Sequence, residues 1–374
     1  MHKLTLEDVA KVCPLFALDG EVRSIAPFGN GHINDTFRVR TKNADGIKID
    51  YILQRINTAV FKNPIAVMDN IRAVTEHVAH HINRRGGNAL RQTLTVVPTV
   101  DNASCAFDED GGCWRADLMI TDSVSHDTPD SPAMFESAAR TFGEFFMDLD
   151  DFPADQLEET IPMFHNTPNR LRQLREAMEN DAAGRLAEVQ KEIADVLAFE
   201  GDTSYLVDRL ADGRLPLRVT HNDTKLNNIL FDRDTNEGLC VIDLDTVMPG
   251  LSVHDFGDSI RFGAATAAED EQDLSKMHLD LHMFEVYTRG FLEAATNLTE
   301  AEILALPMGA YTMTLECGIR FLKDYLDGDV YFKVDYPEHN LVRARTQFKL
   351  VQDMEQKMAQ MDAIVARVAA EIRK

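Results

Sequence analysis

The sequence is poor in cysteine and contains no paired cysteines. Its 374 residues include five scattered cysteines, none in a C-x-x-C pair: Cys13, Cys105, Cys113, Cys240 and Cys317. This pattern excludes a disulfide framework and a zinc ribbon, and it is typical of a reducing compartment. We therefore expect a cytoplasmic protein.

Long apolar runs and positive charge are also scarce. No run approaches the roughly 18 apolar residues of a membrane span, and residues 1–15 lack the apolar stretch of a signal peptide. Lys and Arg number 38 against 62 Asp and Glu, a formal net charge of −24. Because nucleic acids and anionic membranes bind clustered Lys and Arg, we expect neither as a partner.

The order of periodic segments predicts an α+β fold with two lobes. The first part reads as β-β-β-α-β-β, with strands expected at Val22–Pro27, Asp35–Arg40, Asp50–Ile56, Leu94–Val100 and Trp114–Thr121, and a helix from Pro64. Helical periods dominate later, at Met134–Leu149, Thr167–Met178, Ala182–Phe199, Tyr205–Ala211 and a final stripe from Leu350 to Ile372, around a β-rich island at Leu217–Val247. We expect a small antiparallel β-sheet lobe at residues 1–121 and a larger, mainly helical lobe at 122–374.

A polar loop inside the β-rich island carries the strongest chemical signal. His221, Asp223 and Asn228 form an H-x-D-x-x-x-x-N spacing, and Asp243 and Asp245 follow at i, i+2, which predicts that both face one side of a strand. Phosphoryl transfer needs a carboxylate near the attacking hydroxyl and hard oxygen ligands for Mg²⁺. Each residue alone is as well explained as a turn cap or a solvated loop residue, but the ordered set favours a phosphoryl-transfer site.

The set resembles the motifs of the protein-kinase-like superfamily, in its aminoglycoside phosphotransferase and choline kinase branch. Five segments are similar to those of bacterial N-acetylhexosamine 1-kinases: Gly29–Thr36, His221–Leu230, Ile242–Gly250, Asp255–Gly263 and Tyr336–Arg343. The resemblance spans about residues 15 to 365. It implies a two-lobed protein-kinase-like fold, with nucleotide bound by residues 1–121 and catalysis and sugar binding in residues 122–374. It also implies ATP as co-substrate with Mg²⁺, and transfer of a phosphate to the anomeric hydroxyl of GlcNAc or GalNAc.

The resemblance assigns roles to the loop residues. Asp223 is expected to be the catalytic carboxylate, with Asn228 and Asp243 as Mg²⁺ ligands that Asp245 assists. His221 and Asp255 are expected to support the catalytic loop, Asp255 in a structural role.

For the nucleotide, the resemblance places the turn Gly29, Asn30 and Gly31 over the phosphates, although any hairpin can carry such a turn. The third strand departs from the superfamily pattern, because Gln54 stands where a phosphate-pairing Lys is expected. Glu76, on the following helix, is either the partner of that position or a surface charge. Met119 and Ile120 either contact the adenine or belong to the core.

The candidates for sugar binding are His32, Asn34, Phe262, Arg320 and Tyr331, and the phosphates are an alternative target for His32 and Asn34. Each has a structural alternative, such as a solvent-exposed turn for His32 and Asn34, core packing for Phe262, or an ion pair of Arg320 with Glu316 at i, i+4. A single Trp makes an aromatic cage for a quaternary ammonium unobvious, which argues against choline.

Two other functions stay open. One is a kinase of the same fold with a different acceptor, such as a hexose, an amino alcohol or an aminoglycoside. The other is a non-catalytic nucleotide-binding scaffold, which the missing strand Lys suggests. We expect a monomer whose partners are ATP and a small-molecule sugar.

Overall fold

The structure is a computed structural model that describes residues 4–29 and 34–373. The chain folds into two compact units that each combine separate segments. Unit 1 contains Met1–Val124, Asp151–Ile161 and Leu230–Met248, and unit 2 contains Ser125–Asp150, Pro162–Ile229 and Pro249–Lys374. Two later segments thus join the N-terminal unit, and the assignment of nucleotide and sugar binding to residues 1–121 and 122–374 stays a prediction.

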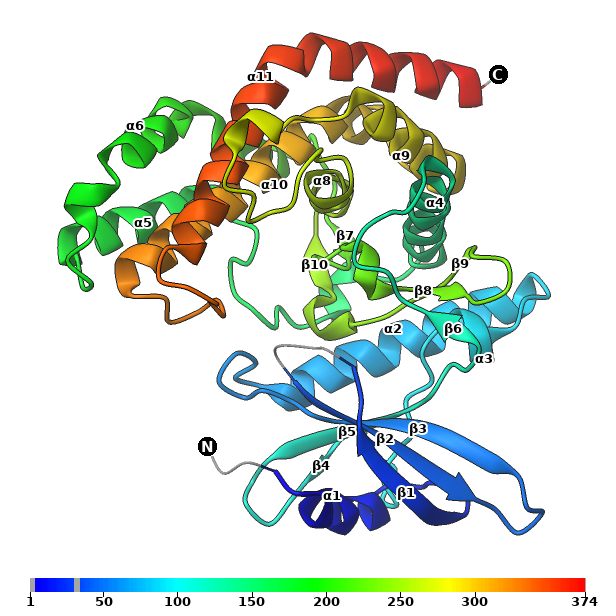
Figure 1. The fold of residues 1–374 in the computed structure, drawn as a ribbon. Helices are drawn as coiled ribbons and strands as arrows, with labels where there is room; N and C mark the ends of the chain where they lie inside the picture. The colour runs from blue at the N-terminus through cyan, green and yellow to red at the C-terminus, as the bar shows by residue number, and fades with distance from the viewer. Residues whose placement is uncertain (1–3, 30–33, 374) are drawn as a thin grey trace. The chain divides into compact units, whose positions relative to one another are not determined.

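Unit 1 is built on the expected antiparallel sheet, which Figure 1 shows with α1 (Leu6–Val12) beside it. Its strand order is β1-β2-β3-β5-β4, with β1 at Glu21–Pro27, β2 at Asp35–Lys42, β3 at Lys48–Arg55, β4 at Ala106–Phe107 and β5 at Cys113–Leu118. Alternate residues on the strands pack with α1 into one apolar cluster, which includes Val9, Val39, Leu53 and Trp114. The period-2 pattern of the sequence therefore gives one buried sheet face.

The helix that follows β3 is α2 (Pro64–Arg84). Asn63 caps it by accepting a hydrogen bond from the N–H of Ala66, and Pro64 occupies the first turn, where a missing N–H costs nothing. Its buried face includes Met68, Ile71, Val74 and Val78, whereas Ile65 is 49% exposed. The predicted helix is confirmed, and only its first apolar residue faces solvent.

The prediction of a strand at Leu94–Val100 is wrong. The segment is extended but forms only isolated bridges, between Val96 and Asp117 and between Thr99 and Phe16. Pro98 has no N–H to donate, so it cannot continue a hydrogen-bonded ladder. The partner of β5 is instead the short β4, across the turn at Asp108–Gly112.

The other elements of unit 1 are short. They are α3 (Ala89–Gln92), the 3₁₀ helices at Cys13–Leu15, Ala154–Gln156 and Leu244–Thr246, and a sheet in the order β6-β8-β9, with β6 at Ser123–Val124, β8 at Ile229–Asp232 and β9 at Gly238–Val241.

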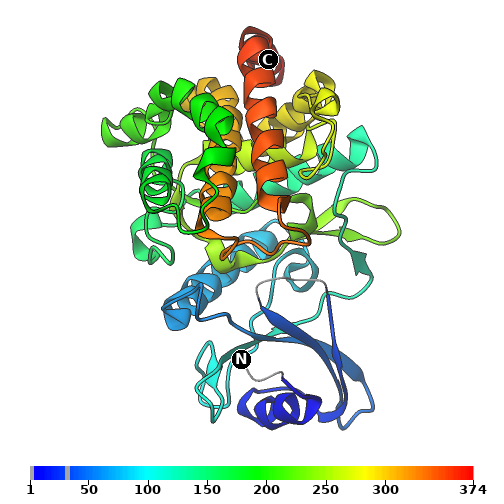
Figure 2. The same ribbon diagram turned by 60° about the vertical axis from the view of Figure 1, so that its left-hand side comes forward.

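Unit 2 is mainly helical. Its helices are α4 (Pro132–Asp148), α5 (Thr167–Asn180), α6 (Gln190–Ala198), α7 (Tyr205–Ala211), α8 (Ser252–Gly263), α9 (Leu281–Ala294), α10 (Glu300–Asp327) and α11 (His339–Ile372). Figure 2 shows α11 running along α10, and the apolar stripe of α11 is buried in the core of its own unit. The short strands β7 (Arg218–Thr220) and β10 (Met248–Gly250) pair with each other. Among the described residues, no helix has the length and apolar character needed to cross a membrane.

The predicted helix at Ala182–Phe199 is only half correct. Asp181 and Gly184 adopt left-handed conformations, with φ of 39° and 67°, and these end the α-helical path. The chain makes a 3₁₀ turn at Leu186–Glu188 before α6 begins at Gln190.

Helices α8 and α10 touch at their backbones through two glycines. A Cβ atom on Gly257 would overlap the carbonyl oxygen of Gly309, and a Cβ on Gly309 would overlap the carbonyl oxygen of Val253. Side chains at these positions would push the helices apart. The glycines therefore allow α8, which carries Asp255, to pack closely against α10.

We expect Gly309→Ala to destabilise the protein, because the added methyl group cannot be accommodated between two backbones. Overpacking of this kind costs about 1–3 kcal/mol. Urea unfolding of both proteins would measure the change. Gly201→Ala is the matched control, since an added Cβ there meets nothing within 4 Å. Equal stability of the two variants would contradict the proposed helix contact.

Candidate active site

One buried carboxylate holds the loop after β7 in place through hydrogen bonds. Asp255, in the first turn of α8, accepts hydrogen bonds from the backbone N–H groups of His221 at 2.8 Å and Asn222 at 2.7 Å. Asn222 has a φ of 65°, a left-handed conformation that turns consecutive N–H groups towards one anion. Thr224 adds a bond from its hydroxyl to the carbonyl oxygen of Asp255. Asp255 thus fixes the conformation of the loop and lies beside His221.

His221 is fully buried under the same loop. Its ring makes T-shaped contacts with the rings of Phe142 and Phe145, with centroids 5.8 and 6.3 Å apart. Its Nδ1 accepts a hydrogen bond of 3.2 Å from the N–H of Asp223. The imidazole therefore braces the backbone of Asp223.

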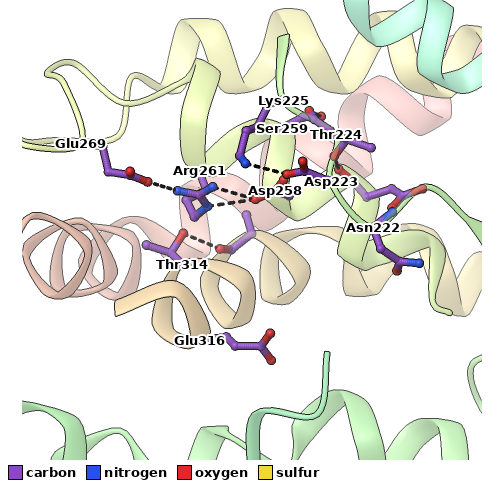
Figure 3. A network of polar contacts seen from close by, with 12 residues as sticks. Asn222, Asp223, Thr224, Lys225, Asp258, Ser259, Arg261, Glu269, Thr314 and Glu316 are labelled. Carbon is purple, nitrogen blue, oxygen red and sulfur yellow. Dashed lines mark hydrogen bonds and ion pairs between the residues drawn. The ribbon is translucent and has the colours of Figure 1, made fainter. Parts of the chain in front are cut away.

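Asp223 presents a partly exposed carboxylate between two donors. Lys225 Nζ lies 2.7 Å from its Oδ1, and Asn228 Nδ2 lies 3.2 Å from its Oδ2 (Figure 3 shows Lys225 pointing towards Asp223). Burial alone would raise the pKa of Asp223, but the Lys225 ammonium outweighs it and holds the pKa below its usual value. The carboxylate is therefore ionised at neutral pH and able to accept a proton from a hydroxyl group.

A second layer of charges lies beside the loop. Arg261 of α8 bridges Asp258 Oδ1, at 2.9 Å from its Nε, and Glu269 Oε1, at 2.7 Å from its Nη1 (Figure 3). Sequence reasoning missed Lys225, Asp258 and Arg261. Their signals were present, since Lys225 stands two residues after Asp223, and Asp258 and Arg261 share one face of α8 at i, i+3.

The expected strand geometry of Asp243 and Asp245 is wrong. Strand β9 ends at Val241, and Asp243 has a left-handed backbone, with φ of 60°, from which the 3₁₀ helix at Leu244–Thr246 begins. The alternation of a strand therefore does not orient these side chains. Both belong to unit 1, whereas Asp223 and Asn228 belong to unit 2. The metal-binding roles of Asn228, Asp243 and Asp245 stay predictions.

A buried cation that sequence reasoning missed lies beside Gln54. Arg115 on β5 pairs in register with Gln54 on β3, and its Nε donates a 2.8 Å hydrogen bond to Gln54 Oε1. The Arg115 guanidinium also forms an ion pair with Asp245. Only 5% of the Arg115 side chain is exposed. A single Arg in the strand Cys113–Leu118 was the only signal in the sequence.

Asn34 joins this cluster from the start of β2. Its Nδ2 donates to Asp245 Oδ2 at 2.7 Å, and its Oδ1 accepts from the N–H of Asn57 at 2.9 Å. Burial would lower the pKa of Arg115, but the carboxylates of Asp245, Asp117 and Asp243 raise it. Arg115 therefore stays charged, and Asn34, Gln54, Arg115 and Asp245 form one connected group, which we call the Arg115 cluster.

The remaining nucleotide candidates are dispersed over unit 1. Gly29 has a φ of 74°, as a tight turn requires, while Asn30, Gly31 and His32 lie outside the described residues. Glu76 is 68% exposed and pairs with Arg72, so it is a surface charge. The N–H of Met119 donates to the carbonyl oxygen of Asp50, and Ile120 is buried.

The acceptor candidates Arg320 and Tyr331 come together in unit 2. The guanidinium carbon of Arg320 lies 5.4 to 5.8 Å from the ring centroids of Phe164, Phe332 and Tyr331. Glu316 does not form the suggested ion pair with Arg320. Its carboxylate instead contacts His165 Nδ1 at 2.9 Å and Thr167 Oγ1 at 2.8 Å.

The third acceptor candidate in unit 2 is Phe262, on α8. Its ring packs against the neighbouring Arg261, whose guanidinium carbon lies 5.9 Å from the ring centroid. It is half-buried, so both core packing and substrate contact stay open for it.

Comparison with known proteins gives a family and several structural relatives. The profile of the phosphotransferase enzyme family matches residues 24–289. A microcompartment-associated aminopropanol kinase superposes with a TM-score of 0.61 at 15% identity, covering 96% of this chain and 99% of that one. An aminoglycoside phosphotransferase from Alicyclobacillus acidocaldarius gives 0.55 at 14% identity, covering 100% and 97%. A choline kinase from Streptococcus pneumoniae gives 0.53 at 12% identity, covering 94% and 99%. At these identities the structures show a shared kinase-like fold.

Asp117, beside the Arg115 cluster, is a buried carboxyl group with one oxygen atom that lacks a hydrogen bond within the described part of the chain. It is 6% exposed, and its Oδ1 has no hydrogen-bond partner among the described residues. Burial raises its pKa from 3.8 to about 6, although Arg115, at 4.0 Å, acts in the opposite direction.

We expect Asp117→Asn to flatten the pH dependence of stability. Between pH 4 and 6 the unfolded chain loses the Asp117 proton and the folded protein retains it, so wild-type stability falls as the pH rises through this window. The shift from 3.8 to about 6 corresponds to about 3 kcal/mol. Urea unfolding at pH 4.5 to 7 would measure it, and parallel curves for both proteins would contradict the assignment.

Proposed function

The chain belongs to the phosphotransferase enzyme family, and from this we propose that it is a kinase that phosphorylates the anomeric hydroxyl of an N-acetylhexosamine with ATP. The products would be ADP and the α-1-phosphate of GlcNAc or GalNAc. The observation that carries the proposal is the carboxylate of Asp223, held between Lys225 and Asn228 on a loop that Asp255 fixes by hydrogen bonds.

The proposed reaction requires the protein mainly to position the anomeric hydroxyl and the γ-phosphate. The anomeric oxygen attacks the γ-phosphorus in line, the bond from the γ-phosphorus to the β,γ-bridging oxygen breaks, and the hydroxyl proton passes to Asp223. The C1–O bond of the sugar stays intact. Lys225 keeps Asp223 ionised until the proton arrives. Orientation of the hydroxyl and compensation of phosphate charge supply most of the acceleration.

We infer a divalent metal from the family, and Asn228 and Asp243 each have side-chain oxygen atoms of the kind that Mg²⁺ prefers. Asn228 directs its Nδ2 at Asp223, at 2.8 Å from the carbonyl oxygen and 3.2 Å from Oδ2, so its amide oxygen is the atom available as a ligand. Asp243 offers a carboxylate, and hard oxygen ligands are those that Mg²⁺ prefers. When bound, the ion would offset the negative charge of the phosphates.

Arg115 supplies the cation that β3 lacks. Residues opposite each other on neighbouring strands lie about 5 Å apart on the same face of the sheet. Arg115 therefore offers its charge close to the place where Gln54 stands for the expected Lys. Asp245 and Gln54 hold the guanidinium in one orientation, which suits it to bind phosphate oxygens in a fixed geometry.

The charge around Arg320 favours an uncharged acceptor. Arg170 and Arg320 both flank Phe164, with guanidinium carbons 5.9 and 5.4 Å from its ring centroid. Two cations disfavour the ammonium groups of amino alcohols and aminoglycosides. Guanidinium donors beside aromatic rings suit a sugar with hydroxyl and acetamido oxygens. Together with the resemblance of the five segments, this supports the N-acetylhexosamine over the other acceptors.

An ADP-release screen tests the proposed reaction. We expect turnover with GlcNAc or GalNAc and little with plain hexoses, amino alcohols or aminoglycosides, and phosphorus NMR should locate the ester at C1. Asp223→Asn should lower kcat by about 10²- to 10⁴-fold with ATP binding unchanged. Asp234→Asn, on the exposed turn after β8, is the control that keeps full activity.

The outcomes separate the rival functions. Turnover restricted to amines would replace the proposed acceptor. Nucleotide binding without ADP release for any acceptor would identify a scaffold. Full activity of Asp223→Asn would remove Asp223 from its role.

The role of Arg115 is tested by moving its charge to the neighbouring strand. Arg115→Gln should raise the KM for ATP by about 10- to 100-fold, because a charged hydrogen bond contributes about 1.5–3 kcal/mol. The double variant Gln54→Lys with Arg115→Gln returns the cation to β3 and should recover most of the loss. Arg55→Gln, on the same strand as Gln54 but facing the other side, is the control.

The melting temperature of each variant shows whether the protein stays folded when Arg115, the buried ion-pair partner of Asp245, is replaced. An unchanged KM for ATP in folded Arg115→Gln would contradict the assignment, and so would a double variant no better than the single one.

A further inference from the structure

A second group of ligand-type side chains lies in unit 1, at the C-terminal half of α2. The Nε2 atoms of His77 and His81 lie 2.8 and 3.2 Å from one oxygen of Asp151, its Oδ1. The three ligand atoms are all within 4.8 Å of one another. One carboxylate oxygen therefore faces two imidazole nitrogens.

The local structure holds these three side chains in place. Residues at i, i+4 on a helix lie one above the other on one face, which brings the rings of His77 and His81 to a centroid distance of 4.8 Å. The edge of Phe152 packs against His77 at 5.2 Å. The arrangement is thus fixed by the helix on one side and by residues next to Asp151 on the other.

The segment that begins at Asp151 is also fastened to α2 further along. Asn70 donates from Nδ2 to the carbonyl oxygen of Glu158 at 2.8 Å, and its Oδ1 accepts from the N–H of Glu158 at 3.0 Å. This pair of bonds keeps residues 151–161 on α2 independently of the two histidines. The position of Asp151 therefore does not depend on an ion.

We propose that His77, His81 and Asp151 bind a divalent first-row transition ion of the Zn²⁺ type, with water completing the coordination. Two imidazoles and one carboxylate are a donor set that Zn²⁺ accepts. Ligand bonds of about 2.0–2.2 Å in a tetrahedron place neighbouring ligand atoms about 3.4 Å apart. The observed 2.8 and 3.2 Å would have to widen by about 0.6 and 0.2 Å, and all three ligand atoms already lie within 4.8 Å of one another.

The donor set suits a cation, because an aspartate carboxylate faces two imidazole nitrogens. Mg²⁺ prefers oxygen ligands, so two imidazoles select against the ion expected with ATP. The site is therefore distinct from the phosphoryl-transfer chemistry, and bound metal would tie Asp151 to α2.

Metal titration of the full chain tests this inference without any kinase assay. The protein is stripped with EDTA, dialysed into excess Mg²⁺ to fill oxygen sites, and titrated with Zn²⁺ against a chromophoric chelator. We expect one equivalent to bind. His77→Gln and His81→Gln should each weaken binding at least tenfold, because Gln keeps a donor near Asp151 but is a poor zinc ligand. His80→Gln, next to His81 and outside the group, should bind like the wild type.

Two further readouts decide the outcome. Zn²⁺ should raise the melting temperature of the wild type and of His80→Gln, and not that of His77→Gln or His81→Gln. Co²⁺ should give a spectrum of nitrogen and oxygen ligands without a thiolate band. Absence of stoichiometric binding would overturn the proposal. So would wild-type affinity for Zn²⁺ in His77→Gln and His81→Gln, or a thiolate band that assigns the ion to a cysteine.

Discussion

The hydrogen bonds from the backbone of His221 and Asn222 to the buried carboxylate of Asp255 determine the geometry of the loop that carries Asp223. A carboxylate removed from water costs free energy unless donors surround it, and here the loop supplies them. The loop must therefore adopt the conformation that points these N–H groups at α8. The position of α8 in turn depends on its glycine contact with α10. Packing of two helices is thus transmitted, through one carboxylate, to the side chain of Asp223.

The same principle organises the charges of unit 1. A net charge of −24 predicts that the protein binds polyanions poorly. Unit 1 nevertheless contains a buried, charged Arg115, which Asp245 and Gln54 orient. Burying an ion pair is tolerated when further hydrogen bonds satisfy both partners, and Asn34 completes that requirement for Asp245. The net charge sums over the whole chain, whereas binding of a phosphate group depends on a few cations held at defined positions.

Features that depend on residues close together in the sequence could be predicted, and those that depend on contacts between distant residues could not. The meander of β1 to β3 and helix α2 follow from periods and caps within a few residues, so they were predictable. Pro98 and the left-handed Gly184 broke elements whose apolar patterns looked continuous. Arg115 escaped notice because its value depends on the register of β5 against β3, a pairing between residues far apart in the chain. The spacing of Asp243 and Asp245 misled for a related reason, since β9 ends before them.

The chemistry of the region around Arg320 follows from which charges are already satisfied. Glu316 lies four residues before Arg320 on α10, and it would be a natural partner for an ammonium group. Burial alone would raise its pKa, but His165 outweighs burial and brings the pKa to about 2, so the carboxylate is ionised and engaged. Burial also lowers the pKa of the neighbouring His254 to about 3, which keeps that ring uncharged. With Glu316 hydrogen-bonded to His165 and Thr167, no described carboxylate forms an ion pair with Arg320, and this is why we propose a neutral, oxygen-rich acceptor for the region.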